Sequence, residues 1–186
     1  GLAVVLIGEN PASEVYVANK IKGCEAVGFL SFEHRHPKGL AAGDLKALIE
    51  KLNKDKTVDG ILVQLPLPSP LKEEEVLKWL DPMKDVDGLT AHSQGLLMSG
   101  HPLALPCTPA GVMALLEYYK IPISGKNAVV VGRSNIVGKP MAQLLLQASA
   151  TVTICHSKTA DLRSFTSKAD IVVVAAGKAR LLGKDD

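Results

Sequence analysis

The stretch that decides the fold is Asn127-Ala128-Val129-Val130-Val131-Gly132-Arg133-Ser134-Asn135-Ile136-Val137-Gly138-Lys139-Pro140. Its continuous apolar run predicts a buried strand over 127–131, and the pattern that follows predicts a helix over 138–147. Further strands are predicted at 151–154 and 170–175. Strand, helix and strand at this spacing form a βαβ unit, which implies a parallel sheet with a right-handed crossover.

The turn between that strand and that helix is a candidate phosphate site, because free N–H groups at a helix N-terminus attract anions. Its glycines, Gly132 and Gly138, do not have the usual G-x-G-x-x-G spacing. An alternative is that they only make a tight turn and let the helix meet the sheet. The next strand ends in Cys155-His156-Ser157-Lys158-Thr159, which has no carboxylate for a ribose 2′-hydroxyl. Hydroxyl and basic groups there, with Arg133, favour the 2′-phosphate of NADP over NAD.

The first half of the chain repeats the alternation of strands and helices. After this half, the stretch 81–109 is expected to be rich in loops, and a helix is predicted over 109–119. The domain boundary is expected between Leu96 and Pro109. Strands are predicted at 2–7, 29–34 and 60–65, and helices at 11–27, 40–53 and 72–80.

Composition excludes several classes of protein. The 186 residues are 47% hydrophobic with a net charge of +2, which is typical of a globular domain and too balanced for a nucleic-acid or membrane partner. Aromatic residues make up only 4%, which argues against a base-stacking surface. The three cysteines are odd in number and widely spaced, so no disulfide framework is predicted.

Polar residues in the first half form a second candidate site. Ser13, Tyr16 and Lys20 recur at helical spacing and are expected on one helix face. Gln64 ends a predicted strand, where ligands gather in α/β sheets, and Asp87 lies in the loop Lys84-Asp85-Val86-Asp87-Gly88. The alternatives are a solvated helix surface and a simple turn. No metal site is predicted, since His34-Arg35-His36 has no further ligands at suitable spacing.

Together these segments resemble the bifunctional methylenetetrahydrofolate dehydrogenase/methenyltetrahydrofolate cyclohydrolase family in order and spacing. The resemblance covers essentially the whole chain. The segments that carry it are Pro11-Ala12-Ser13-Glu14-Val15-Tyr16-Val17-Ala18-Asn19-Lys20, Asp59-Gly60-Ile61-Leu62-Val63-Gln64-Leu65-Pro66-Leu67-Pro68, Lys84-Asp85-Val86-Asp87-Gly88, Pro106-Cys107-Thr108-Pro109 and Val131-Gly132-Arg133-Ser134.

The resemblance implies an α/β fold of two domains: an N-terminal catalytic domain over 1–105 that binds folate, and a Rossmann-like NADP-binding domain over 106–186. Both domains are expected to be incomplete, with the chain truncated at both ends. The implied reactions are oxidation of 5,10-methylenetetrahydrofolate by NADP and hydrolysis of the product to 10-formyltetrahydrofolate. A homodimer in the cytoplasm is implied, although an organellar form that has lost its targeting segment also fits.

The resemblance also assigns roles to residues. Lys20 matches the lysine that transfers protons in hydrolysis, Gln64 the residue that positions it, and Tyr16 the ring that stacks on the substrate. Asp87 matches the carboxylate that holds the pterin, and it completes the implied catalytic set. The implied substrate-binding residues are Ser13, Tyr16, Gln64, Leu65, Pro66 and Asp87. The cofactor-binding candidates are Gly132, Arg133, Ser134, Val137, Gly138, Pro140, His156, Ser157 and Thr159.

Two other functions stay open on the residues alone. One is an NADP dehydrogenase of another small substrate, built on a similar two-domain plan as in shikimate-like or malic-type enzymes. The other is a non-catalytic, truncated module for dinucleotide binding or dimerisation. The combination of Tyr16, Lys20, Gln64 and Asp87 favours the folate enzyme over both.

Overall fold

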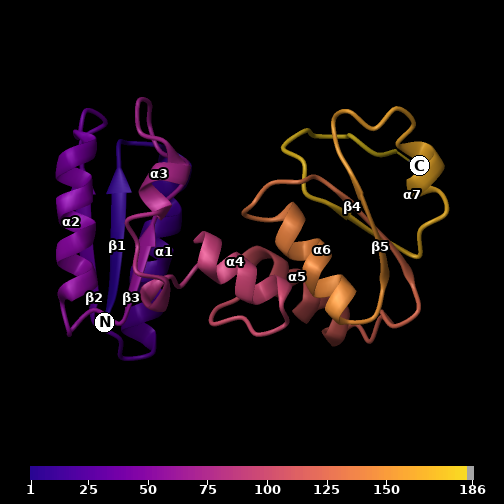
Figure 1. The fold of residues 1–186 in the computed structure, drawn as a ribbon, viewed down its shortest axis with the longest axis horizontal. Helices are drawn as coiled ribbons and strands as arrows, with labels where there is room; N and C mark the ends of the chain where they lie inside the picture. Colours follow the sequence, from indigo (N-terminus) through magenta and orange to yellow (C-terminus); the bar gives the residue numbers. More distant parts are fainter. Residues whose placement is uncertain (184–186) are drawn as a thin grey trace. The chain divides into compact units, whose positions relative to one another are not determined.

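The computed structural model describes residues 1–183, which divide into two compact units (Figure 1). The first unit is Gly1–Ser93 and the second is Gln94–Asp186. Each unit has its own parallel sheet of three strands. The α/β class predicted from alternating strands and helices is therefore confirmed for both halves of the chain.

The first sheet has the order β2-β1-β3, with β1 (Leu2–Ile7) between β2 (Ser31–His36) and β3 (Gly60–Val63). Val5 of β1 lies opposite His34 on one side and Val63 on the other, and all strands are parallel. The central strand is almost entirely buried, as its unbroken apolar sequence predicts for a strand covered on both faces.

Helices α1 (Pro11–Ala26) and α2 (Ala42–Lys54) cover opposite faces of this sheet. Successive side chains of a strand point to opposite faces, so β1 supplies a core to each helix. The side chains of Ala3, Val5 and Ile7 join the core formed with α2, whereas Val4 and Leu6 join the core formed with α1. The sheet is thereby fixed between two helices, and its carboxyl edge is left for polar residues.

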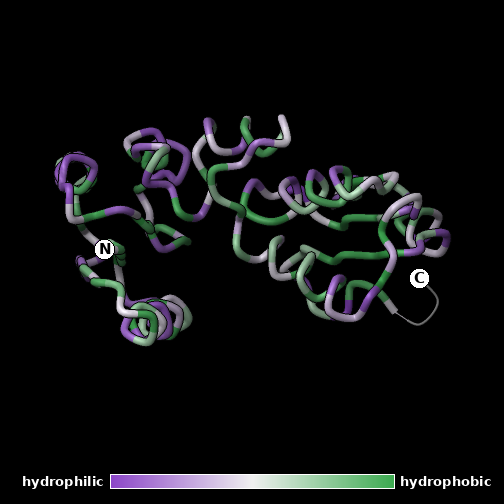
Figure 2. The backbone as a smooth tube through the Cα atoms, turned by 90° about the horizontal axis from the view of Figure 1, so that it is seen from below, coloured by the Kyte–Doolittle hydropathy of each residue, from purple (hydrophilic) through white to green (hydrophobic). Residues whose placement is uncertain are grey.

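The second sheet has the order β5-β4-β6 and follows the same plan. Its central strand β4 (Asn127–Val131) pairs in parallel with β5 (Thr151–Cys155) and β6 (Ile171–Val174). Figure 2 shows these strands as hydrophobic segments of the tube, coloured green, between more hydrophilic segments.

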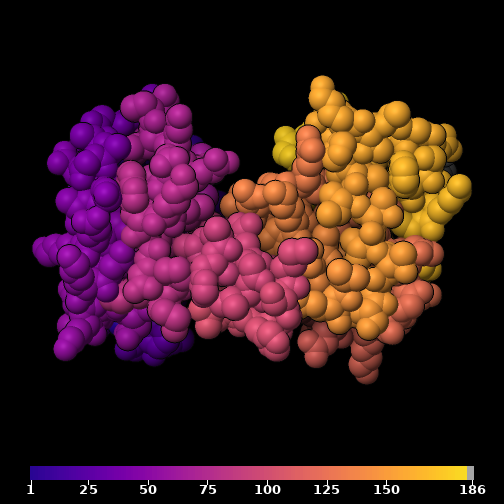
Figure 3. Space-filling model, in the orientation of Figure 1, coloured from indigo at the N-terminus to yellow at the C-terminus, as the bar shows by residue number. Residues whose placement is uncertain are grey.

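Two helices, α5 (Cys107–Tyr118) and α6 (Gly138–Gln147), pack on one face of the second sheet. Met141 and Leu145 of α6 are fully buried against Ala128 and Val130 of β4. The short helix α7 (Arg163–Thr166) lies in the connection from β5 to β6, and Leu162 and Leu181 pack on the other face of the sheet. The space-filling view shows that side chains close the gaps between elements within each unit (Figure 3).

The stretch 81–109 is more regular than its sequence predicts. The predicted helix over 72–80 is reduced to α3 (Glu73–Leu77). A 3-10 helix, η1 (Pro82–Lys84), and the helix α4 (Ala91–Met98) lie within the predicted loop. The prediction of a loop there was wrong because the apolar residues of α4 do not form a one-sided helical stripe.

The structure divides the chain before the last turns of α4, between Ser93 and Gln94. The boundary expected from sequence lies between Leu96 and Pro109. The expected domain limit at residue 105 therefore lies after the end of α4, whereas the observed division lies within that helix. Within residues 1–183, no helix has the length and apolar character needed to cross a membrane.

Candidate functional site

The first candidate site begins at the start of α1. The side-chain oxygen of Asn10 accepts hydrogen bonds from the backbone N–H groups of Ala12, at 3.0 Å, and Ser13, at 3.2 Å. Pro11 occupies the first helical position, where its missing N–H costs nothing. This N-cap fixes the first turn of the helix that carries the next candidate residues.

The three polar residues of α1 differ in exposure. Ser13 is only 3% exposed, whereas Tyr16 is 63% exposed and Lys20 is half-buried. Ser13 is thus buried like Val17, whereas Tyr16 and Lys20 are accessible, and the expectation that the three residues share one helix face stays a prediction. Tyr16 and Lys20 remain neighbours, one turn apart.

Lys20 and Gln64 are brought together from residues far apart in sequence. The Nζ atom of Lys20 donates a hydrogen bond to Oε1 of Gln64 at 3.2 Å. The Gln64 amide nitrogen in turn donates to the carbonyl of Leu65 at 2.8 Å, which leaves Oε1 directed at the lysine. The backbone N–H of Gln64 extends the β3 pairing by donating to the carbonyl of Val5, so the residue is held at the strand end.

Leu65 and Pro66 follow Gln64 at the carboxyl edge of the sheet, joined by a cis peptide bond. Leu65 is half-buried and Pro66 is exposed. An open cavity of about 550 Å³ lies where the three strands end. Its lining includes Gly8, Asn10, Lys38, Pro66 and Ser69. Of the predicted substrate-binding residues, Pro66 contributes to this cavity.

Asp87 lies within electrostatic reach of Lys20. Burial raises the pKa of the Asp87 carboxyl above its ordinary value, the positive charge of Lys20 lowers it, and the negative charge of Asp85 raises it. Burial dominates, so the net shift is upward. Lys20, Gln64 and Asp87 thus form one group of polar side chains at the first sheet.

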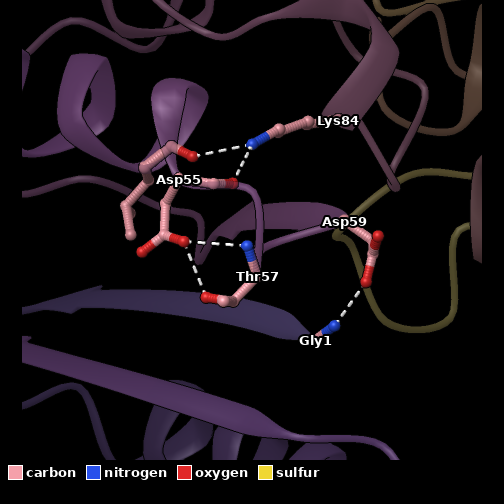
Figure 4. Close-up of polar contacts among 6 residues, drawn as sticks. Gly1, Asp55, Thr57, Asp59 and Lys84 are labelled. Atoms are coloured by element: carbon pink, nitrogen blue, oxygen red, sulfur yellow. Dashed lines mark hydrogen bonds and ion pairs between the residues drawn. The ribbon is translucent and has the colours of Figure 1, made fainter.

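The loop that carries Asp87 is anchored on α2. The Nζ atom of Lys84 donates to the carbonyl oxygens of Leu52, at 2.9 Å, and Asp55, at 2.7 Å, at the helix C-terminus (Figure 4). A cation at this end of a helix also complements the helix dipole. Asp55 closes the following turn by accepting from the N–H and hydroxyl of Thr57.

The second candidate site is the turn between β4 and α6. Gly132 has a φ of +139°, and a Cβ atom there would collide with the carbonyl of Ala175. A Cβ atom on Gly138 would collide with the carbonyl of Gly132. Both glycines are therefore required by close backbone approach, which is the structural role weighed as an alternative in the sequence analysis.

Ser134 caps α6. Its hydroxyl oxygen accepts from the N–H groups of Val137 and Gly138, each at 3.2 Å. Arg133 and Ser134 are exposed, Val137 is half-buried, and Pro140 is buried in the packing of α6. The exposed residues of the turn include Arg133 and Ser134, and the Ser134 hydroxyl has a proton left to donate to a ligand.

A second turn follows β5 at the same edge of the sheet, because Val131 and Cys155 lie opposite each other in parallel strands. The N–H of His156 donates to the hydroxyl of Thr159, and the N–H of Thr159 donates back to the His156 carbonyl. Ser157 is exposed at the tip. The two turns therefore present hydroxyl and basic groups at one sheet edge.

No role is predicted for Asp85 from the sequence, although it belongs to the motif Lys84-Asp85-Val86-Asp87-Gly88. Asp85 is buried, and its carboxylate accepts hydrogen bonds from residues on the far side of Asp87. The available signal was the Thr90-x-x-Ser93 pattern that follows, which is typical of a helix N-cap. Among residues 1–183, no three His, Cys, Asp or Glu side chains gather as a possible metal site.

Two family models match the chain. The model described as tetrahydrofolate dehydrogenase/cyclohydrolase, catalytic domain, matches residues 1–87. The model described as tetrahydrofolate dehydrogenase/cyclohydrolase, NAD(P)-binding domain, matches residues 106–186. The matched regions contain every predicted site residue of the first and second candidate sites.

Similar proteins agree with these matches. The chain is 58% identical over 185 residues to the bifunctional protein FolD of Burkholderia thailandensis, and it spans 65% of the length of that relative. It is also similar to the crystal structure of the bifunctional FolD enzyme of Campylobacter jejuni, with a TM-score of 0.95, 49% identity, and coverage of 99% of this chain and 66% of that one. The FolD structure of Trypanosoma brucei, complexed with NADP and an inhibitor, gives a TM-score of 0.91 and 37% identity, and the match covers 96% of this chain and 61% of that one.

Proposed function

The chain belongs to the tetrahydrofolate dehydrogenase/cyclohydrolase family, and from this membership we propose that its protein is a bifunctional enzyme of one-carbon metabolism. The first reaction transfers a hydride from 5,10-methylenetetrahydrofolate to NADP and gives 5,10-methenyltetrahydrofolate. The second adds water to that product, gives 10-formyltetrahydrofolate and releases a proton. The observation that carries the proposal is the 3.2 Å contact between Lys20 and Gln64 beside Asp87.

Hydrolysis requires a group that moves protons between water and the substrate. Lys20 is that group in the proposal, because its Nζ atom is held by the amide oxygen of Gln64 at the sheet edge. Gln64 positions the amine and restricts its rotamers, since its own amide nitrogen is bound to the Leu65 carbonyl. A held lysine delivers or accepts a proton along one direction rather than many.

Binding of the pterin is assigned to Asp87 and Tyr16. A half-buried carboxylate suits paired N–H donors, because the hydrogen bonds replace the water that burial removes. The largely exposed ring of Tyr16 supplies an apolar surface on which a flat heterocycle can stack, with its hydroxyl left toward solvent. We propose Leu65 and Pro66 as further contacts, and Ser13 as support for the helix from its buried position.

NADP is the proposed cofactor, and when bound it accepts the hydride. The residues proposed to hold it lie in the two turns at the carboxyl edge of the second sheet. Arg133 and Ser157 are exposed there, the segment 155–159 has no carboxylate, and the hydroxyl of Ser134 has a proton to donate. These groups fit a 2′-phosphate. Gly132, Val137, Gly138, Pro140, His156 and Thr159 shape the two turns in this proposal.

A spectrophotometric assay of the full-length protein tests the proposed function. With 5,10-methylenetetrahydrofolate, we expect reduction of NADP and much slower reduction of NAD. With 5,10-methenyltetrahydrofolate, we expect accelerated loss of its absorbance as it is hydrolysed. A folded sample that reduces neither cofactor would instead support a non-catalytic dinucleotide-binding or dimerisation module. Reduction driven by a different hydroxy acid would support a dehydrogenase of another small substrate.

We further propose a homodimer located in the cytoplasm, and domains divided near residue 105. Sedimentation equilibrium of the full-length protein measures the oligomeric state, and a mass equal to one chain would contradict the homodimer.

Limited proteolysis tests the division of the chain into two domains near residue 105. Cleavage confined to 99–106 is expected, because these residues connect α4 to α5 and belong to neither helix.

A further inference from the structure

Asp85 is a buried carboxylate that lies outside the catalytic and binding roles assigned above. It is only 4% exposed, and both of its oxygens accept hydrogen bonds. Oδ1 accepts from the N–H of Leu89 at 3.1 Å. Oδ2 accepts from the N–H of Thr90 and from the hydroxyl of Ser93, each at 2.7 Å. Three donors on one buried carboxylate are an arrangement that fixes backbone, since losing one leaves a buried charge poorly satisfied.

These contacts close the loop around Asp87. Asp85 lies two residues before Asp87, and its partners Leu89 and Thr90 lie two and three residues after it. Between them, Gly88 has a φ of +66°, which allows the tight reversal. Asp87 is therefore at the tip of a loop whose two arms are tied together by one side chain.

The loop is also tied to the rest of the unit. The backbone of Asp85 forms a parallel bridge with Ile61 of β3, the strand that Gln64 directly follows. The residue before Asp85 is Lys84, whose side chain donates hydrogen bonds to two carbonyl oxygens at the C-terminus of α2. The loop that carries Asp87 is thus attached to β3, the same strand that positions Gln64.

The hydroxyl groups after the loop continue the network. The N–H of Ser93 donates to the Thr90 hydroxyl at 3.2 Å, an N-cap contact for α4. Because the Ser93 hydroxyl donates to Asp85, the 2.9 Å contact between the two hydroxyls is donated by Thr90. The network thus leads through the Ser93 hydroxyl to the Asp85 carboxylate, which is the acceptor in each of its hydrogen bonds.

We propose that Asp85 is a positioning residue for the folate site: its carboxylate holds the loop 85–90 so that Asp87 faces Lys20. The inference rests on the proposed function, because Asp87 matters only if it binds the pterin. It adds a residue whose effect on the substrate passes through Asp87.

The pKa of the Asp87 carboxyl depends on the charge and the packing that Asp85 provides. The charged groups that act on Asp87 are Lys20 of α1, which lowers its pKa, and Asp85 of its own loop, which raises it. Replacing Asp85 by a neutral residue of the same shape removes the raising charge. The pKa of Asp87 should then fall, and any exposure of Asp87 caused by loosening of the loop lowers it further, because burial is the largest cause of the raised pKa.

The test compares Asp85→Asn, Ser93→Ala and the control Asp55→Asn in the full-length protein. Asp55 accepts from a backbone N–H and a hydroxyl, as Asp85 does, but both donors belong to Thr57, outside the loop 85–90, and the backbone carbonyl that Lys84 binds is unchanged by the substitution. For Asp85→Asn we expect kcat/KM to fall about 10- to 100-fold, through KM as well as kcat, because displacement of a binding group by about 1 Å has effects of this size. Ser93→Ala should show a smaller loss, and Asp55→Asn none.

Carbon-13 NMR titration of the Asp87 carboxyl, assigned with Asp87→Asn, gives a readout independent of folate activity. We expect a lower pKa for Asp87 in Asp85→Asn and an unchanged one in Asp55→Asn. A folded Asp85→Asn protein with wild-type kcat/KM and an unshifted Asp87 would overturn the inference. If Asp85→Asn fails to fold, Ser93→Ala decides, since unchanged kinetics in that variant would also overturn it. An inactive wild-type protein with the expected NMR shift would contradict the proposed function and leave the geometry of the loop supported.

Discussion

At the scale of single residues, the contact between Lys20 and Gln64 is the main structural support for the proposed hydrolysis reaction. Replacing Lys20 with Met keeps the approximate length of the side chain and removes the amine to which we assign proton transfer. We expect Lys20→Met to lose hydrolysis by about 10²- to 10⁴-fold, the usual contribution of a positioned acid or base. The measurement is the initial rate of 5,10-methenyltetrahydrofolate hydrolysis.

Lys22 provides the matched control, because it is an exposed lysine of the same helix. Lys22→Met should hydrolyse the substrate at the wild-type rate. Hydrolysis retained in Lys20→Met would remove Lys20 from its proposed role.

The raised pKa of Asp87 predicts that its ionised carboxylate destabilises the folded protein at neutral pH. Burial holds the proton on the folded carboxyl more tightly than on the unfolded one, so stability is lost as pH rises through the raised pKa. Asp87→Asn cannot ionise and avoids this loss. Its Tm should exceed that of the wild type at neutral pH, and the difference should vanish below about pH 4, where an ordinary Asp is protonated.

Asp55 gives the opposite sign and serves as a control. The hydroxyl and the backbone N–H of Thr57 lower the pKa of its carboxyl, so charging favours the folded state. Asp55→Asn should therefore lower the Tm slightly at neutral pH, with the difference disappearing on acidification. A Tm below wild type for Asp87→Asn at neutral pH would contradict the assignment of burial as the dominant effect.

Arg133 is the residue that should decide between the two nicotinamide cofactors. Its exposed guanidinium follows β4 at the edge where Ser157 follows β5. Arg133→Ala should raise the KM for NADP about 10- to 100-fold, the equivalent of a charge-assisted contact of roughly 1.5–3 kcal/mol, and leave that for NAD nearly unchanged. Arg163→Ala, an exposed arginine on α7, should change neither. Unchanged selectivity in Arg133→Ala would argue against a 2′-phosphate contact at this residue.

At the scale of elements, the N-cap of α1 links stability to the candidate site. Asn10 satisfies two N–H groups of the helix that carries Tyr16 and Lys20. Asn10→Ala should destabilise the protein by about 1 kcal/mol, measured by urea unfolding. Asn19→Ala, at an exposed position inside the same helix, should be neutral or slightly stabilising because Ala is the better helix former. Equal stability of the two variants would show that the cap contributes nothing.

The turn into α6 makes a contrasting prediction about glycine. An added methyl group at Gly138 would meet the carbonyl of Gly132, which is backbone and cannot rotate away. Gly138→Ala should therefore destabilise the second unit by about 2 kcal/mol or more, measured by thermal unfolding. Gly111→Ala, at an open position within α5, should stabilise by about 0.5–1 kcal/mol. Equal tolerance of both changes would mean that the turn relaxes without cost.

Strands and long helices could be predicted from sequence because their patterns are local. Strand 127–131 and helix 138–147 have the predicted bounds, and β1 spans the predicted 2–7. Strand 29–34 is displaced to 31–36, since its end is set by pairing with β1. The helix α4 was missed because its sequence has no amphipathic stripe, and the local cap in which Thr90 accepts from the N–H of Ser93 is a weaker signal.

At the scale of the whole molecule, the chain consists of two units with separate cores. Each unit repeats one arrangement, a central strand flanked by two parallel neighbours, with its polar candidate residues at the carboxyl edge. This is the edge at which open α/β sheets bind ligands. The arrangement explains how motifs scattered over the sequence belong to only two sites.

The sequence by itself determined the α/β class and the positions of the central strands, because hydrophobic periodicity is a property of the chain. Motif spacing and the family resemblance also predicted Lys20, Gln64, Asp87 and Arg133 as site residues, and their roles stay predictions. Tertiary structure alone decided which of these side chains meet. The Lys20–Gln64 contact joins residues 44 apart, and the burial of Ser13 follows from the packing of α1 on the sheet. It also decided the role of Asp85, whose hydrogen bonds exist only once the loop has closed. Contacts, burial and the pKa shift of Asp87 depend on distances through space, and local sequence patterns do not contain those distances.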